Sequence, residues 1–354
     1  MVTYIIRRLL LMPLLLFGVT LLIFGMLQFL SPIERSALYV RDIPKNQNAL
    51  EGVIREYGLD QPFYVQYYRW LVGTIDPETG QRVGGILFGD FGYSRTADEP
   101  VAQIIRERFP NTVDLALWTI GPLLFVGIWL GVQAAVHQNG WIDQAARIFS
   151  IVGTSFPTFV FGLLVLMIFY ANLRWLPPGR LSDSLNQVVL SSSFHHYTSL
   201  LTIDSILNGR FDIFWDALKH MILPIITLSY ISWATFVRLT RSSMLETLRQ
   251  EYVTTARAKG LPENAVINKH ARPNAMLPVA TLAGFTVVGL LGGVVITETV
   301  FNYPGIGAAA AVAAEQLDVV TVLGFALFDG VILIIANLIV DVMYAYIDPR
   351  VRLS

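Results

Sequence analysis

The stretch EYVTTARAKGLPENAVINKHARPNAMLP, residues 251–278, is charged and contains glycine and proline, yet strongly apolar runs flank it on both sides. Apolar residues before and within it recur at spacings of three or four, which is typical of one face of a helix. The pattern stops at Gly260, a residue type that readily adopts the left-handed conformation that ends helices. The sequence therefore predicts one continuous helix up to this glycine. Its expected apolar face comprises Met244, Leu245, Leu248, Tyr252 and Ala256.

A second short helix is expected after the glycine. Pro262 suits the first position of a helix, and Glu263 would lie in its first turn, near the positive end of the helix dipole. Pro273 is expected to end this helix before the next apolar run begins. Ala256 and Ala258 add little bulk beside the turn, so a partner could approach the backbone closely. We therefore interpret the stretch as a docking element.

The flanking runs belong to a chain that is unusually apolar. Of its 354 residues, 54% are hydrophobic and 14% are charged, against about 25% charged residues in an ordinary soluble domain. A helix needs about 20 consecutive apolar residues to cross a bilayer. The sequence therefore predicts an all-α integral membrane protein with six transmembrane helices. The runs are Leu9–Leu30, Leu115–Val136, Ile148–Ala171, Met221–Val237, Met276–Ile296 and Val319–Tyr346.

Basic residues near the ends of the spans predict the orientation, because lysine and arginine favour the cytoplasmic side. Six spans place both termini on one side, and eleven basic residues gather at the termini and connections of that side. The short connection Thr297–Asp318 on the other side has none. We therefore expect both termini and residues 251–278 to be cytoplasmic. The alternative to docking is a solvated loop whose charges only set this orientation. The eleven residues are Arg7, Arg8, Arg147, Arg241, Arg249, Arg257, Lys259, Lys269, Arg272, Arg350 and Arg352.

The spans divide the chain into four parts. The first apolar run is longer than the roughly 7–15 residues of a secretory signal, so we expect it to remain as a span. The segment after it is long and polar, and Asp76–Gly85 within it is a turn-rich excursion. The predicted parts are the N-terminus with the first span (1–30), a large extracytoplasmic segment (31–114), the other five spans (115–346) with an inner loop (241–275), and a cytoplasmic tail (347–354).

Composition excludes several kinds of site. The chain has no cysteine, which excludes disulfides, zinc–thiolate sites and iron–sulfur clusters. The formal net charge is −1 and the sequence has no sustained basic run, so we expect no nucleic-acid partner. The five histidines lack the spacing of metal ligands, and no metal site is predicted. No glycine is followed by lysine, so the phosphate-binding loop of ATPases is absent.

Glu251–Leu261, which reads EYVTTARAKGL, is followed at an interval by Leu277-Pro278 and resembles the cytoplasmic EAA-type loop of ABC importer permeases. The match is to the B-type permease subunits of dipeptide and oligopeptide (peptide/nickel/opine) importers, and it covers nearly the whole chain. This resemblance implies the type I ABC importer permease fold and a non-catalytic subunit of a peptide importer in the cell membrane. The other matching motifs are residues 4–9, 58–62, 89–94, 298–307 and 341–350.

The resemblance also implies partners. Two ATP-binding cassette ATPase subunits would bind ATP and magnesium, so this chain itself needs no cofactor. A second, homologous permease of the C-type and an extracytoplasmic substrate-binding protein would complete the complex in the membrane lipid. Closure of the ATPases around nucleotide would move residues 241–275 as a rigid body and switch the spans between inward-facing and outward-facing states.

The same resemblance assigns coupling to residues of the EAA-type loop. We expect Glu251, Arg257 and Lys259 to make polar contacts with the ATPase. Ala256 and Gly260 are expected to allow close packing against it. The full set of expected coupling residues is Glu251, Tyr252, Ala256, Arg257, Ala258, Lys259, Gly260 and Leu261.

Charged residues inside spans are costly and point to function. Asp329, in the sixth run, could face the substrate path and meet the amino group of a peptide; the alternative is a hydrogen-bonded structural aspartate. A proton-coupled secondary transporter would use Asp329 and Asp341 as relay groups, but we find no inverted internal repeat of the kind such transporters show. Within the importer class, oligosaccharides, nickel complexes and glutathione stay open as alternative substrates.

Glycines and prolines in the runs predict how the helices pack and bend. Glycines four residues apart allow helices to approach closely, within the chain or against a second permease. Proline inside a membrane helix can kink it. The glycine pairs are Gly127 with Gly131 and Gly289 with Gly293, and the prolines are Pro122, Pro157 and Pro224.

Overall fold

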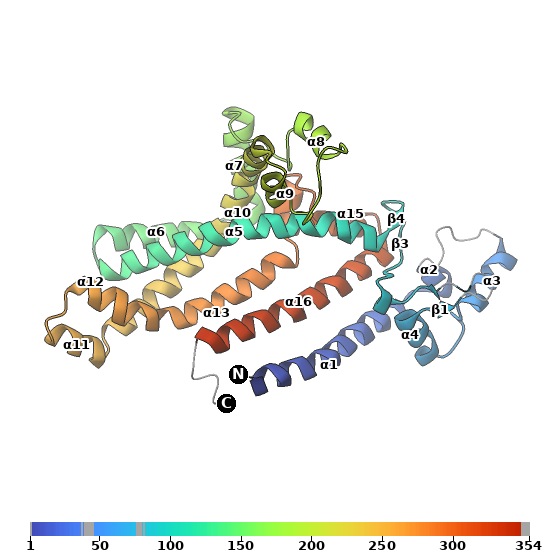
Figure 1. The fold of residues 1–354 in the computed structure, drawn as a ribbon, viewed down its shortest axis with the longest axis horizontal. Coiled ribbons are helices and arrows are strands. Elements are labelled where there is room, and N and C mark those ends of the chain that lie inside the picture. Colours follow the sequence, from blue (N-terminus) through green and yellow to red (C-terminus); the bar gives the residue numbers. More distant parts are fainter. Residues whose placement is uncertain (1, 37, 39–45, 76–79, 81, 348–354) are drawn as a thin grey trace. The chain divides into compact units, whose positions relative to one another are not determined.

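The computed structural model describes residues 2–36, 38, 46–75, 80 and 82–347, and most of its regular structure is helical. The chain divides into two compact units. One unit comprises Asn111–Pro304 with the chain from Ile339 onward, and the other comprises Val2–Pro110 with Gly305–Leu338. Helices α5 (Val101–Val136) and α16 (Val319–Ile347) have residues in both units (Figure 1).

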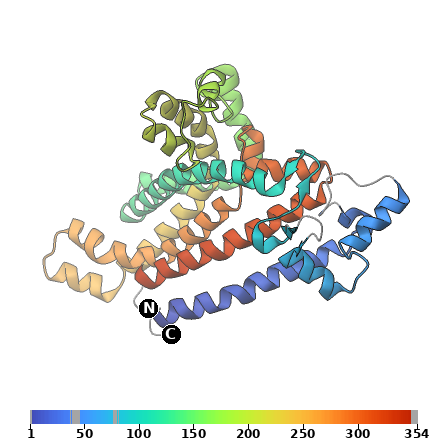
Figure 2. The same ribbon diagram turned by 45° about the vertical axis from the view of Figure 1, so that its right-hand side comes forward.

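The unit around Asn111–Pro304 is built on the long helices α10 (Phe211–Leu248) and α13 (Arg272–Leu291), which pack against each other (Figure 2). Helix α6 (Trp141–Ser155) packs on another part of α10. Two elements are π-helical, η2 and η3. The other elements of this unit are α7 (Thr158–Leu166), η2 (Met167–Asn172), α8 (Asp183–Val189), α9 (Leu201–Leu207), α11 (Glu251–Ala258), α12 (Glu263–Ala265), η3 (Val266–Ala271) and α14 (Val295–Val300).

The second unit combines the first helix with the large segment that follows it. Phe24 in this helix and Trp70 share a buried core with Leu327 of α16. Two short antiparallel pairs lie in the segment; Thr74 faces Val83 in one, and Tyr93 faces Pro100 in the other. Besides parts of α5 and α16, its elements are α1 (Val2–Leu27), α2 (Pro32–Ser36), α3 (Gln47–Glu56), α4 (Phe63–Val72), β1 (Thr74–Ile75), β2 (Arg82–Val83), η1 (Ile86–Phe88), β3 (Tyr93–Ser94), β4 (Glu99–Pro100) and α15 (Ile306–Glu315).

Five of the described helices are long and apolar enough to cross a membrane, and the number is six if one sharply bent helix pair counts as a single, broken span. The broken span consists of Trp141–Ser155 and Thr158–Asn172, which bend by 100° at their junction. Pro157 lies at this junction, as expected for a residue that lacks a backbone N–H and disrupts a helix on its N-terminal side. With the bent pair counted as one span, the prediction of an all-α membrane protein with six spans is confirmed.

The ends of the helices differ from the ends of the apolar runs. Helix α10 begins at Phe211 and ends at Leu248, well beyond the predicted run Met221–Val237 on both sides. Helix α5 begins at Val101, inside the segment 31–114 that we predicted to lie outside the membrane. Hydropathy marks the part of a helix that lies in hydrocarbon, whereas helix length is set by caps and packing, so the two need not coincide. Within Asp76–Gly85, residues 76–79 and 81 lie outside the described part of the chain.

The glycine pair Gly127 and Gly131 confirms the predicted close approach of two helices. A Cβ atom added at Gly127 would lie 2.6 Å from the Cβ of Phe236, and one at Gly131 would lie 2.5 Å from the Cβ of Thr240. Helices α5 and α10 therefore approach so closely at these two glycines that no Cβ atom would fit between them. A Cβ at Gly289 would meet no atom of the described residues within 4 Å, so a contact of that glycine with a second permease stays a prediction.

A buried carboxylate fixes the start of α16 to the β3–β4 pair. Asp318 is 5% exposed, and its Oδ2 atom accepts hydrogen bonds from the Ser94 hydroxyl (2.8 Å) and the backbone N–H groups of Arg95 (2.9 Å) and Thr96 (3.1 Å). The backbone N–H and hydroxyl of Thr321 also donate to this carboxylate. Asp318 thus caps the first turn of α16 and satisfies backbone groups of the turn between the strands.

Candidate functional site

The 241–275 segment begins in the last turns of α10 and continues into α11, and a break that the sequence did not predict separates the two helices. Helix α10 ends at Leu248, Gln250 is extended, and α11 begins at Glu251. The prediction of one continuous helix up to Gly260 is therefore wrong. The break rotates the register, so that Val253 is fully buried whereas Tyr252 is 43% exposed. Tertiary packing has overridden the local helical period, since the segment turns back onto α5 and α13.

The turn at Gly260 follows the expectation closely. Gly260 has a φ of +74°, its N–H donates to the Arg257 carbonyl (2.9 Å), and the Leu261 N–H donates to the Ala256 carbonyl (3.4 Å). This pair of hydrogen bonds is the Schellman motif that closes a helix with a left-handed glycine. In the part of the chain that the structure describes, a Cβ at Gly260 would meet no atom within 4 Å. The backbone conformation, rather than crowding within the chain, therefore explains the glycine.

The second helix does not end at Pro273. Pro262 caps its start, Glu263 lies in its first turn, and the chain then stays helical through the π-helical η3 into α13. Pro273 occupies the first turn of α13, directly after η3, where its missing N–H is tolerated. The prediction that Pro273 ends the helix is therefore wrong, and Glu263–Leu291 forms one helical span of 29 residues.

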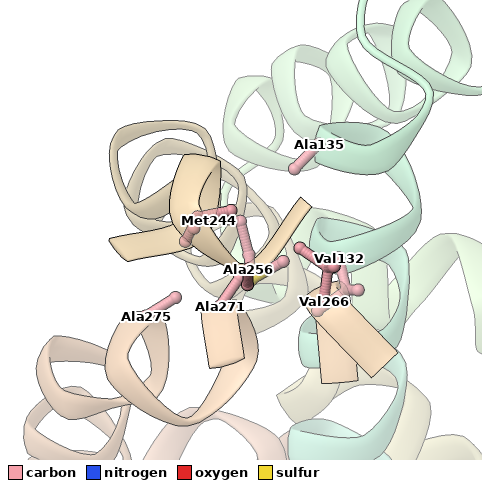
Figure 3. Packing of buried hydrophobic residues seen from close by; sticks show 8 residues of the cluster. Val132, Ala135, Met244, Ala256, Val266, Ala271 and Ala275 are labelled. Atoms are coloured by element: carbon pink, nitrogen blue, oxygen red, sulfur yellow. The ribbon is translucent and has the colours of Figure 1, made fainter. Parts of the chain in front are cut away.

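One apolar core joins residues 241–275 to three long helices (Figure 3). Val132 and Ala135 of α5 face Met244 of α10, and small residues of the two short helices fill the space between them. Val253 and Val266 are both fully buried in this core, although neither belongs to the apolar face predicted from the sequence. The sequence does contain a signal for the burial of Val253, because its spacing of three residues from Ala256 is typical of one face of a helix. The eight buried residues are Val132, Ala135, Met244, Val253, Ala256, Val266, Ala271 and Ala275.

The predicted coupling residues lie on both faces of α11 and its turn. Ala256 is 5% exposed and packs inside the core of its own chain, so its side chain is turned away from the exposed face. Tyr252 and Leu261 are apolar or aromatic side chains on that face, with 43% and 39% exposure. The exposed members are Glu251, Tyr252, Arg257, Ala258, Lys259, Gly260 and Leu261.

An ion pair closes the turn from outside. The Arg257 guanidinium donates from Nε (3.1 Å) and Nη2 (2.7 Å) to the two carboxylate oxygens of Glu263. These hydrogen bonds raise the pKa of Arg257. Both side chains are substantially exposed, so the pair contributes only about 0.2–1 kcal/mol. Arg257 thus has a partner within the chain, which holds α11 and α12 together across Gly260.

The intramembrane aspartates are not part of this cluster. Asp329 lies half-buried in α16, next to Gly330, where an added Cβ would lie 2.9 Å from a side-chain atom of Val19 in α1. The side chain of Asp341 lies outside the described residues. Among the described residues, no group of three or more His, Cys, Asp or Glu side chains could hold a metal ion.

Comparison with known proteins agrees with this architecture. Over residues 126–353 the chain matches the model of the family "Binding-protein-dependent transport system inner membrane component", and over residues 1–116 it matches the N-terminal model of such membrane components. It is 39% identical to the probable D,D-dipeptide transport system permease protein DdpB of Escherichia coli (strain K12), over 85% of this chain and 84% of that protein.

Two further relatives match over their whole length. The dipeptide transport system permease protein DppB of Alkalihalophilus pseudofirmus is 34% identical over 99% of this chain and 100% of that protein. The oligopeptide transport system permease protein AppB of Bacillus subtilis is 35% identical with the same coverage. All these names describe transport permeases rather than enzymes. With its apolar spans and this match over most of its length, the chain belongs to the family of binding-protein-dependent transport system inner membrane components.

Proposed function

We propose that this chain is the B-type permease subunit of an ABC importer that carries dipeptides and oligopeptides across the inner membrane. One observation carries the proposal. Residues 241–275 present an exposed face, while their buried face shares one core with α5, α10 and α13. The names of the relatives, which refer to dipeptide and oligopeptide transport systems, support peptides as the substrate class.

The exposed face of residues 251–261 is the proposed docking surface for one of two ATP-binding cassette ATPases. Tyr252 and Leu261 supply apolar contact area, and Glu251 and Lys259 supply charge beside them. Arg257 fixes the turn through Glu263, and this pair leaves the guanidinium exposed enough to meet the ATPase as well. ATP and magnesium are bound by the ATPases in this proposal, and this chain contributes the surface that receives their motion.

The shared core is what turns docking into coupling. Because α11, η3 and α13 pack on the end of α5 without a flexible linker between η3 and α13, a displacement of the turn displaces the helices too. Such rigid-body movement of packed helices is a common way to switch between two states. A C-type permease and an extracytoplasmic substrate-binding protein complete the proposed complex, with both termini of this chain on the cytoplasmic side.

Asp329 is our candidate for contact with the amino group of a peptide. It is a half-buried carboxylate within a helix that is otherwise strongly apolar. Charged groups in such positions are rare and mark substrate or ion paths. Asp329→Asn is expected to lower peptide uptake while leaving the amount of assembled complex unchanged.

The proposed function is tested with the whole complex in proteoliposomes. The chain is purified with its permease partner and ATPases, the binding protein is added outside, and uptake of a labelled dipeptide is measured with and without ATP inside. Uptake that needs ATP and survives a protonophore supports the proposal. Uptake that follows a proton gradient would establish a secondary transporter instead, and uptake of a nickel complex, glutathione or an oligosaccharide but no peptide would reassign the substrate.

A further inference from the structure

A buried ion pair joins α6 to α10 at Arg241, the first residue of the 241–275 segment. The Asp143 carboxylate accepts hydrogen bonds from Arg241 through Nε (2.6 Å) and Nη2 (2.8 Å). The side chain of Asp143 is 0% exposed and that of Arg241 is 21% exposed. The Asn139 backbone N–H donates to the same carboxylate at 2.9 Å, and Arg147 lies 3.8 Å away, one turn along α6. The hydrogen bonds to the carboxylate thus come from the loop before α6 and from α10, whereas Arg147 is a neighbouring, largely exposed charge.

Such a pair does more to fix geometry than to add stability. The free-energy cost of removing two charges from water offsets much of the energy of their attraction, so a buried ion pair is weak evidence for a stabilising role. A two-point contact between a guanidinium and a carboxylate, however, fixes both the angle and the register of the two groups. Asp143 therefore sets how the amino end of α6 sits on α10.

The position of the pair connects it to the proposed docking surface. Arg241 lies three residues before Met244, where the core of the 241–275 segment begins. Farther along the same contact, a Cβ at Gly153 of α6 would lie 2.9 Å from the Cβ of Ala234 in α10. Helix α10 is thus held against α6 by the ion pair and this close contact, and against α5 by Gly127 and Gly131.

We infer that Asp143 and Arg241 are positioning residues for coupling, which fasten α6 to the body that carries the docking surface. This inference rests on the proposed function. It extends the moving body to α6, so that motion received at residues 251–261 reaches the 100° bend at Phe156 and Pro157.

The absence of cysteine allows a direct test in the complete transporter. In the variant Asp143→Cys/Arg241→Cys the ion pair is lost, and a short bis-methanethiosulfonate reagent then links the two sulfurs. Peptide uptake per ATP hydrolysed is measured before and after linking. We expect the unlinked variant to lose at least about tenfold, because the two-point contact that fixes α6 on α10 is gone, and the linked variant to recover to within about twofold of the original chain, since a covalent link restores the position. Arg147→Gln, which removes the neighbouring exposed charge, serves as the control and should transport normally.

Two results would overturn the inference. Normal uptake per ATP in the unlinked variant would show that the pair is not needed for coupling. Uptake that stays low or falls further after linking would show that α6 and α10 must separate during the cycle.

If the double cysteine variant fails to assemble, Asp143→Asn keeps the side-chain volume while removing the charge, and is expected to lose the same coupling. Failure of the original complex to take up peptide with ATP would refute the proposed function rather than this inference. The pair is then judged by hydrogen exchange: Asp143→Asn should speed exchange in both 137–150 and 241–258, and unchanged exchange in either segment overturns it.

Discussion

The turn at Gly260 allows backbone geometry to be separated from contact with a partner. Gly260 has a φ of +74°, and a Cβ added to it would meet no atom of the described residues within 4 Å. Gly260→Ala therefore destabilises the fold only through the left-handed backbone, by about 1–2 kcal/mol. Gly260→Asn destabilises it less, because asparagine tolerates this conformation. Asparagine thus keeps the turn and adds a side chain to its outer surface.

Gly209 provides a matched control outside residues 241–275. Its φ is +68° and its Cβ position is also empty within 4 Å. The same two hydrogen bonds close the end of α9, from the Gly209 N–H to Ile206 (3.0 Å) and from the Arg210 N–H to Ser205 (2.8 Å). Equal substitutions at the two glycines should therefore change folding stability equally.

The assay compares the thermal unfolding of the purified complex with its peptide-stimulated ATP turnover in proteoliposomes. Both asparagine variants should keep the midpoint of unfolding within about 1 °C, which corresponds to less than about 1 kcal/mol for a chain of 354 residues. Gly260→Asn should lower ATP turnover at least about tenfold, or 1.4 kcal/mol, if the turn seats against the ATPase. Equal turnover in Gly260→Asn and Gly209→Asn would refute a close contact at this turn.

Three further predictions follow from the core, the start of α16 and the orientation. Val266→Ala removes two fully buried methyl groups and should lower the free energy of unfolding by about 2 kcal/mol, whereas Leu261→Ala on the exposed face should change it by less than about 0.5 kcal/mol; equal losses in denaturant titrations would contradict the assigned faces. The pKa of Asp318 lies below its ordinary value, since burial raises it but hydrogen bonds from Thr321, Thr96 and Ser94 outweigh this effect. Because the folded pKa is lowered, the stabilisation is present above about pH 4 and is lost as the pH falls through the folded pKa. The protection factors of the Arg95 and Thr96 amides, which are exchange rates corrected for the intrinsic rate at each pH, should then fall in acid, and Asp318→Asn should show low protection at every pH; pH-independent protection would exclude this role. Lys259→Cys should react with an impermeant maleimide in inside-out vesicles only, and Tyr197→Cys, at a 62% exposed position between α8 and α9, in right-side-out vesicles only; the reverse pattern would invert the orientation.

Much of the architecture is encoded in local signals of the sequence. The apolar runs specify six spans because bilayer thickness demands about 20 apolar residues in a row, wherever they stand in the chain. Gly260 specifies the end of α11 because glycine, which has no Cβ, adopts the left-handed conformation at little cost. Pro157 also predicts the bend locally, because proline lacks a backbone N–H. Gly127 and Gly131 predict a close contact with another helix, but their spacing does not indicate which helix makes it.

The tertiary structure decided which faces are buried and which charges meet. The helical period predicted that Tyr252 shares the apolar face of Met244 and Ala256, but the helix breaks at Gln250, and Val253 is buried instead. Asp143 and Arg241 pair across 98 positions of sequence, a distance over which periodicity and propensity carry no information. Such contacts depend on how the long helices pack, and packing is a property of the folded chain as a whole. The sequence by itself thus determined the membrane spans and the turn that ends α11, and only tertiary packing determined the apolar core and the ion pair between Asp143 and Arg241.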